Sequence, residues 1–117
     1  MNKFPVPLLT ILLLSLLLAS CTSEPPVRSV LLLAEDIAWS QNLIEAKVGQ
    51  TVELTLRNDG ALDHDFVLEE FGLEVSLSPG EQQTVSFVLT EAGLFDYICS
   101  VPGHQDAGMA GKFAVTE

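Results

Sequence analysis

The chain has 117 residues, which is enough for one globular domain and too few for a multidomain enzyme. Only 5 lysines and arginines stand against 16 aspartates and glutamates, a formal net charge of −11. We therefore expect no nucleic-acid partner, because proteins bind phosphate backbones through basic surfaces. Two cysteines cannot build a disulfide framework, and two histidines cannot fill a centre with several metal ions.

The first 20 residues are typical of an export signal. Lys3 supplies the only positive charge of this segment, and an apolar run follows from Leu8 to Leu18. At about 1.5 Å per helical residue, this run is shorter than the hydrocarbon core of a bilayer, which is about 30 Å thick. The segment therefore predicts a cleaved signal peptide and not a permanent membrane span.

Four residues directly after the apolar run, Leu18, Ala19, Ser20 and Cys21, resemble a bacterial lipobox. The resemblance implies that residues 1–20 are removed and that Cys21, diacylated, becomes the new N-terminus. Acyl chains contribute about 0.8 kcal/mol per buried methylene, so two or three would hold the domain at a membrane surface. We expect an exported lipoprotein, anchored on the periplasmic or extracytoplasmic face of the bacterial membrane. The alternative is a plain secretory signal followed by an incidental cysteine.

The lipobox divides the chain into three parts: a signal peptide at 1–20, a lipid anchor and short tether at 21–28, and a folded domain at 29–117. Without residues 1–20, four cations remain against 16 carboxylates, a net charge of −12. Such a charge favours solubility and basic partners. Assigning Cys21 to the lipid leaves Cys99 as the single thiol of an exported domain, which calls for a specific role.

The pattern of apolar residues in the domain predicts an all-β fold. Apolar and polar residues alternate, or apolar residues share one face, in the ranges 51–57, 64–68, 84–89, 95–99 and 113–115. Turn-forming residues separate these ranges at 47–50, 58–60, 78–81 and 91–93. Residues 29–34 are apolar enough for a strand buried on both faces, and 101–108 are a loop. We expect a two-sheet antiparallel sandwich.

The domain contains four soft or imidazole metal ligands: His64, Cys99, His104 and Met109. The last three follow the spacing Cys-x4-His-x4-Met after one predicted strand, and His64 starts another. Two imidazoles and a thiolate with a weak axial thioether are the ligands of a type 1, or blue, copper electron-transfer site. Thiolate and thioether favour Cu(I) and imidazole suits Cu(II), so a rigid site would change little during electron transfer.

Other interpretations of these residues explain fewer of them. Zinc sites use cysteine and histidine but rarely a thioether. A nucleophilic pair of Cys99 and His104 would leave His64 and Met109 without a role. If the four residues had no shared role and were ordinary core or surface residues, the domain would be a metal-free interaction module.

The segment 95–111, FDYICSVPGHQDAGMAG, resembles the C-terminal copper loop of the cupredoxins, a family that includes plastocyanin, azurin and auracyanin. Its spacing is closest to that of auracyanin-like proteins. Upstream residues are similar as well: Ile44, Ala46, Gly49, Asn58, His64-Asp65-Phe66 and Pro79-Gly80. The resemblance implies a Greek-key β-sandwich of about eight strands, with one copper ion bound near one end through the δ nitrogens of His64 and His104.

One residue departs from the pattern of the family. Asp65 stands where many cupredoxins have an asparagine that braces the copper loop. An ionised aspartate can accept a hydrogen bond from the backbone near Ser100 but cannot donate one.

We expect a membrane-tethered, monomeric type 1 copper protein that carries single electrons between exported redox proteins, such as c-type cytochromes or membrane oxidoreductases. Protein ligands fill all four coordination positions, so we expect no catalytic activity. Electrons would pass through His104, which is flanked by an apolar patch of Val101, Pro102, Ala107 and Ala110. The alternative function is a copper carrier or storage protein.

Overall fold

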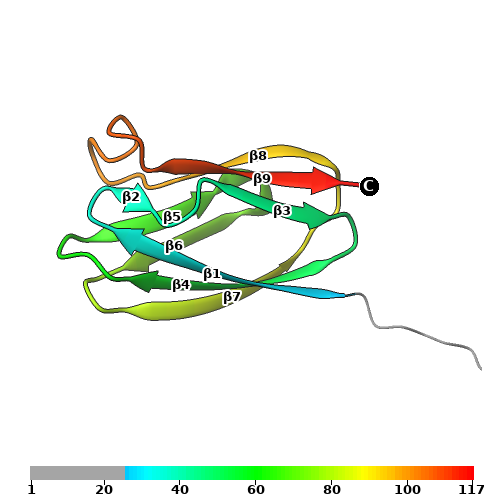
Figure 1. Cartoon of the computed structure of the whole chain (residues 1–117), viewed down its shortest axis with the longest axis horizontal. Coiled ribbons are helices and arrows are strands. Elements are labelled where there is room, and N and C mark those ends of the chain that lie inside the picture. The colour runs from blue at the N-terminus through cyan, green and yellow to red at the C-terminus, as the bar shows by residue number, and fades with distance from the viewer. Residues whose placement is uncertain (1–25) are drawn as a thin grey trace, which may run out of the picture.

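The computed structural model describes residues 26–117, which form nine strands and one short 3-10 helix (Figure 1). The elements are β1 (Val27–Glu35), β2 (Ala38–Trp39), β3 (Leu43–Lys47), β4 (Thr51–Asn58), β5 (His64–Leu68), η1 (Glu69–Phe71), β6 (Leu73–Leu77), β7 (Gln82–Val88), β8 (Gly93–Ile98) and β9 (Ala110–Thr116). The predicted signal peptide and lipobox lie outside these residues. In the described part, no helix is both long and apolar enough to span a bilayer.

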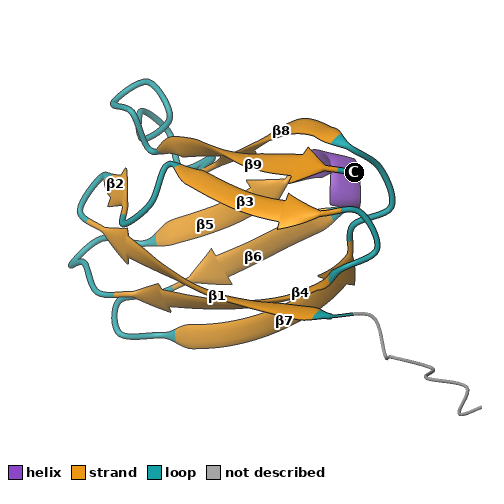
Figure 2. Cartoon of the chain, turned by 45° about the vertical axis from the view of Figure 1, so that its right-hand side comes forward, coloured by secondary structure: helices purple, strands orange, loops and turns teal. Residues whose placement is uncertain are grey.

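The strands form two sheets, with the orders β2-β1-β4-β7 and β3-β9-β8-β5-β6, which face each other as a sandwich (Figure 2). The predicted two-sheet fold is confirmed, with nine strands where about eight were expected. The prediction of purely antiparallel sheets is wrong, because β1 pairs with β4 and β3 pairs with β9 in parallel. Parallel strands that are neighbours in a sheet need a crossover connection. For β1 and β4 this connection includes β3, which follows β1 and precedes β4 in sequence and belongs to the opposite sheet.

Strand β1 also differs from its prediction of burial on both faces. Val30, Leu32 and Ala34 are buried, whereas Leu31 is 47% exposed. A two-layer sandwich has no third layer to cover the outer face of this strand. The apolar residue at the outward position hides the alternation in the sequence. Strand β1 starts at Val27, two residues before the expected start of the domain.

The register of the strands gives the sandwich two distinct ends. At one end, β5 begins at His64, β8 ends just before Cys99, and β9 begins just after Met109. At the other end lie the start of β1 at Val27 and the close of β3 and β9 at Lys47 and Thr116 (Figure 1). We call these the metal end and the tether end.

Candidate metal centre

The four predicted ligands converge at the metal end from two places in the chain, the start of β5 and the loop between β8 and β9. His64 is the first residue of β5, while Cys99 and Met109 flank the loop between β8 and β9. Two backbone hydrogen bonds close this loop: Cys99 N–H donates to Met109 O over 3.0 Å, and Met109 N–H donates to His104 O over 3.0 Å. The loop therefore folds back on itself and holds three of the four residues next to His64.

The donor atoms of the two histidines and the cysteine point toward one another. The Nδ1 atoms of His64 and His104 are 3.2 Å apart. Cys99 Sγ lies 3.8 Å from Nδ1 of His64 and 3.6 Å from Nδ1 of His104. Together with the fully buried Met109, these residues form a site like that of type 1 copper proteins. The predicted ligation through the δ nitrogens agrees with this geometry.

The protonation chemistry of the site also suits a metal ion. Burial, together with the neighbouring His104, lowers the pKa of His64, which favours the neutral imidazole that ligates metals. Burial raises the pKa of the Cys99 thiol, while backbone N–H groups of Asp65 and Val101 oppose that shift. A metal cation bound between the donors would stabilise the thiolate of Cys99 and so counter the effect of burial.

The alternative chemistries fit the arrangement poorly. The fourth predicted donor is the thioether of the buried Met109, a ligand that zinc sites rarely use. Cys99 has no exposed surface, so a substrate cannot reach it as a nucleophile. The donor set therefore fits copper, with two imidazoles, one thiolate and a thioether.

Asp65 connects the two strand ends that carry His64 and Cys99. Its two carboxylate oxygens accept hydrogen bonds from the backbone N–H and the hydroxyl of Ser100. The predicted acceptor role of Asp65 is present in the structure, and the hydroxyl of Ser100 adds a second contact that the sequence analysis did not foresee. These bonds hold the backbone immediately after Cys99 against β5.

Asn58 is a structural residue of this site whose role the sequence analysis missed. It is completely buried. Its Nδ2 donates to the carbonyls of Leu62 and Leu77 over 2.8 and 3.0 Å, and its Oδ1 accepts from Gly60 N–H over 2.9 Å. These bonds fix the loop that leads into His64. The Asn-Asp-Gly sequence signalled a turn but not the burial of its asparagine.

The sequence matches the family of cupredoxin-like domains over residues 8–115. The chain belongs to the cupredoxin family. A copper-binding sandwich with its donor set at one end is the arrangement that this family shares, and the predicted copper cofactor is thereby confirmed.

Three known proteins are similar to this cupredoxin in sequence or in fold. The copper-resistant cuproprotein CopI of Rubrivivax gelatinosus is 26% identical over 71% of this chain and 62% of its own length, so the chain spans less than two thirds of that relative. A reduced auracyanin of Roseiflexus castenholzii shares the fold with a TM-score of 0.70, at 18% identity over 79% of this chain and 99% of that one. The metal-binding domain of the Streptococcus pneumoniae Cu(I)-exporting ATPase CopA, solved with Cu(I), has a TM-score of 0.68, at 18% identity over 82% of this chain and 92% of that one.

Proposed function

We propose that this cupredoxin carries single electrons between exported redox proteins, with one copper ion held by His64, Cys99, His104 and Met109. The observation that carries the proposal is the buried and closely spaced donor set. Bound copper supplies a one-electron couple between Cu(I) and Cu(II).

The protein's contribution is to hold the donors still. The ligand positions are fixed by the ends of β5, β8 and β9, by the closed loop between Cys99 and Met109, and by the bridge between Asp65 and Ser100. Little rearrangement is then needed when the charge of the site changes. Because four buried protein side chains supply the donors, we expect electron transfer without conversion of a substrate.

His104 is the ligand best placed to exchange electrons with a partner. It is 9% exposed, while the other three ligands are at most 2% exposed. Its loop presents the exposed residues Pro102 and Ala107, with the partly buried Val101 and Ala110 close in sequence. A small apolar patch of this kind suits brief contacts, since redox complexes bury less than about 1,200 Å². We propose c-type cytochromes or membrane oxidoreductases as partners, and a monomeric protein.

A copper carrier or storage protein is the second candidate. Two comparisons favour it, because a relative is named a copper-resistant cuproprotein and the domain of a Cu(I)-exporting ATPase shares the fold. Delivery of copper requires an incoming ligand to reach the ion. The burial of Cys99, His64 and Met109 opposes such an exchange and supports retention of the metal.

We further propose that the domain acts outside the cytoplasm, held to the membrane by lipid on Cys21. The basis is the sequence Leu18-Ala19-Ser20-Cys21 behind an apolar run. The purified protein from membranes should carry diacylglyceryl on Cys21, as measured by mass spectrometry. An unmodified Cys21 at a free N-terminus would contradict the anchor.

One experiment separates the two candidate functions. Copper-loaded protein should show an intense visible band from thiolate-to-copper charge transfer, and it should be reduced and reoxidised repeatedly at constant copper content. It should also surrender copper to a Cu(I) chelator far more slowly than it exchanges electrons. Rapid loss of copper to the chelator, together with slow reoxidation, would assign the protein as a carrier.

A further inference from the structure

The tether end of the sandwich combines three features that concern the membrane. It comprises Val27, residues 47–51, residues 88–94 and Thr116. The register places Val27 next to Thr51 and Thr51 next to Val88, and Gly49 N–H donates to Leu89 O over 2.9 Å. Segments from both sheets therefore meet at this end, on the side opposite the metal centre (Figure 1).

The first feature is the short connection to Cys21. Six residue steps separate Cys21 from Val27, and each extended step covers at most about 3.6 Å, so the connection reaches about 20 Å. Strand β1 alone, from Val27 to Glu35, spans about 26 Å at roughly 3.3 Å per residue. A lipid on Cys21 can therefore bring the tether end to a bilayer, but it cannot let the sandwich turn over and stand on its metal end.

The second feature is exposed apolar surface. Eight large hydrophobic side chains are exposed in the described chain, and four of them lie at the tether end: Val27, Val48, Val88 and Leu94. Leu94 and Val27 are the most exposed of all eight, at 66% and 60%. The four side chains come from separate segments: Val27 and Val88 point outward from the four-stranded sheet, Leu94 points outward from the five-stranded sheet, and Val48 lies in the turn after β3. They surround this end of the sandwich, and such a distribution suits the boundary between headgroups and acyl chains.

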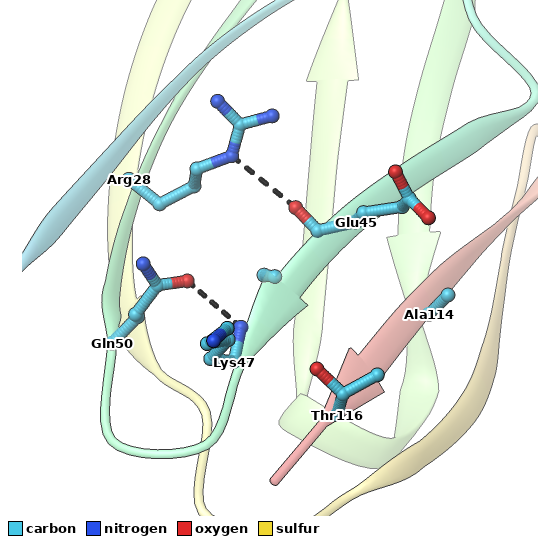
Figure 3. A pocket seen from close by; sticks show the side chains of 7 residues that line it. Arg28, Glu45, Lys47, Gln50, Ala114 and Thr116 are labelled. Carbon is cyan, nitrogen blue, oxygen red and sulfur yellow. Dashed lines mark hydrogen bonds between the residues drawn. The ribbon is translucent and has the colours of Figure 1, made fainter.

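The third feature is a pair of cations beside this apolar surface. Arg28 and Lys47 line a groove of about 370 Å³ with Glu45, Gln50 and Thr116 (Figure 3). Arg28 Nε donates to the carbonyl of Glu45 over 3.2 Å, and the two outer nitrogens of the guanidinium point away from Lys47, Gln50 and Thr116, free to meet a ligand outside the groove. Neither cation forms an ion pair within residues 26–117, whereas the other two cations of this region are paired, Arg57 with Asp59 and Lys112 with Asp96.

Carboxylates at the same end determine which lipid surface fits. Glu45 borders the groove, the exposed Glu117 follows the lining residue Thr116, and the exposed Glu91 belongs to the segment 88–94 of the same end. This mixture of charges matches zwitterionic headgroups, in which a phosphate lies beside an ammonium group, better than a densely anionic surface.

We infer that the tether end rests on a zwitterionic phospholipid surface, with Val27, Val48, Val88 and Leu94 at the acyl boundary and Arg28 and Lys47 at lipid phosphates. The inference rests on the proposed lipid anchor. It places His104 about one sandwich length above the bilayer, so a partner must present its redox group at that height.

The test uses the lipidated protein, loaded with diamagnetic Cu(I), on phosphatidylcholine–phosphatidylethanolamine vesicles that contain a small fraction of Gd(III)-chelating lipid. Amide NMR signals of residues 47–50 and 91–94 should broaden strongly, and those of residues 101–108 should remain sharp. Uniform broadening, or strongest broadening in 101–108, would overturn the inference while leaving the anchor intact. Wild-type protein that fails to float with the vesicles would refute the anchor and, with it, this inference.

Paired variants test which side chains make the contact. The double variants V48S/L94S and R28Q/K47Q should each reduce the broadening at 47–50 and 91–94 by at least half. The matched control L43S/L62S removes two exposed leucines near the metal end and should leave the broadening unchanged. Equal effects of test and control variants would contradict the inference. So would signal changes at 47–50 and 91–94 that depend on protein concentration without vesicles, because they would assign the surface to a second copy.

Discussion

Asp65 holds Ser100, the residue after Cys99, through both oxygens of its carboxylate. The contact joins β5, which starts with His64, to the end of β8, which precedes Cys99. It therefore fixes the distance between two ligands that come from separate strands. It also places a negative charge next to the sulfur, where an asparagine would place none.

Asp65→Ala should lower copper affinity by about 10–100-fold, the usual effect of removing a group that orients metal ligands. Asp65→Asn should keep most of the affinity, since its amide oxygen still accepts from Ser100 N–H. It should raise the reduction potential, because a lost negative charge favours Cu(I) over Cu(II). Competition with a Cu(I) chelator and spectroelectrochemistry measure the two quantities.

Asp63→Asn is the matched control for the charge. Asp63 precedes His64 and forms no side-chain hydrogen bond with the loop residues 99–109 in the described structure. Its neutralisation should shift the potential less than Asp65→Asn does. Equal shifts of the reduction potential would mean that Asp65 acts on it only through the overall electrostatic field of the protein. An unchanged copper affinity in Asp65→Ala would exclude its bridging role.

Cys99→Ser should abolish the intense visible band, because the charge transfer that produces it originates at the thiolate. Met109→Leu should retain copper and the band but change the reduction potential, since an axial thioether is a weak ligand. Absorption spectra and potentials of the copper-loaded variants check both expectations. An intense band in Cys99→Ser would refute the assignment of the ligand set.

Much of this site could be predicted from the sequence because its ligands are rare residues. His64, Cys99, His104 and Met109 stand out by type and spacing, and short alternating segments such as 51–57 identify the strands that position them. The second contact, from the hydroxyl of Ser100 to Asp65, could not be predicted, because a serine side chain in a loop has many possible partners and only the register of β5 and β8 selects this one.

Other parts of the fold were hidden for similar reasons. The parallel pairing of β1 with β4 depends on the path of β3 through the other sheet, which local alternation does not encode. The outer face of β1 carries leucine at position 31, so its exposure is invisible in the pattern. Burial of Asn58 follows from three hydrogen bonds that form only when the loop before His64 closes over it.

Gly111→Ala should destabilise the domain by about 1–3 kcal/mol, the usual cost of overpacking a core. A methyl group at Gly111 would lie 2.2 Å from Cζ of the buried Tyr97 ring, so the ring or the strand must move. Urea unfolding of the apo protein measures the effect. Gly80→Ala is the comparison: its added methyl meets no atom within 4 Å, and its cost comes only from a φ of 80°. A smaller loss for Gly111→Ala than for Gly80→Ala would contradict the predicted crowding.

Stability should fall at alkaline pH because of Tyr97. Burial raises the pKa of Tyr97 to about 12, and its hydroxyl donates to the carbonyl of Gln41 over 2.6 Å. The unfolded chain would release this proton near pH 10, so the contribution is complete below pH 10 and is lost as pH rises toward 12. Tyr97→Phe should flatten the pH dependence of unfolding over this range. An unchanged slope would show that other groups cause the alkaline loss.

Electron transfer to a basic partner, such as a c-type cytochrome, should slow as ionic strength rises. Asp36, Asp63 and Asp65 act electrostatically on His64 and thus lie near the metal centre. Lys112, the one cation near the copper loop in sequence, is paired with Asp96. The field at this end is therefore negative, and it would attract a basic surface over a Debye length of about 10 Å at 0.1 M salt.

The bimolecular rate constant between low and high salt measures this steering, and two double variants locate its source. D63N/D106N removes two carboxylates at the metal end and should reduce the dependence on salt. E53Q/E91Q removes the same charge from β4 and the tether end and should leave most of the dependence in place. Apolar contacts around His104 do not respond to screening, so a residual rate should persist at high salt. A rate that is flat or rises with salt in the wild-type protein would mean that the acidic residues do not steer this partner.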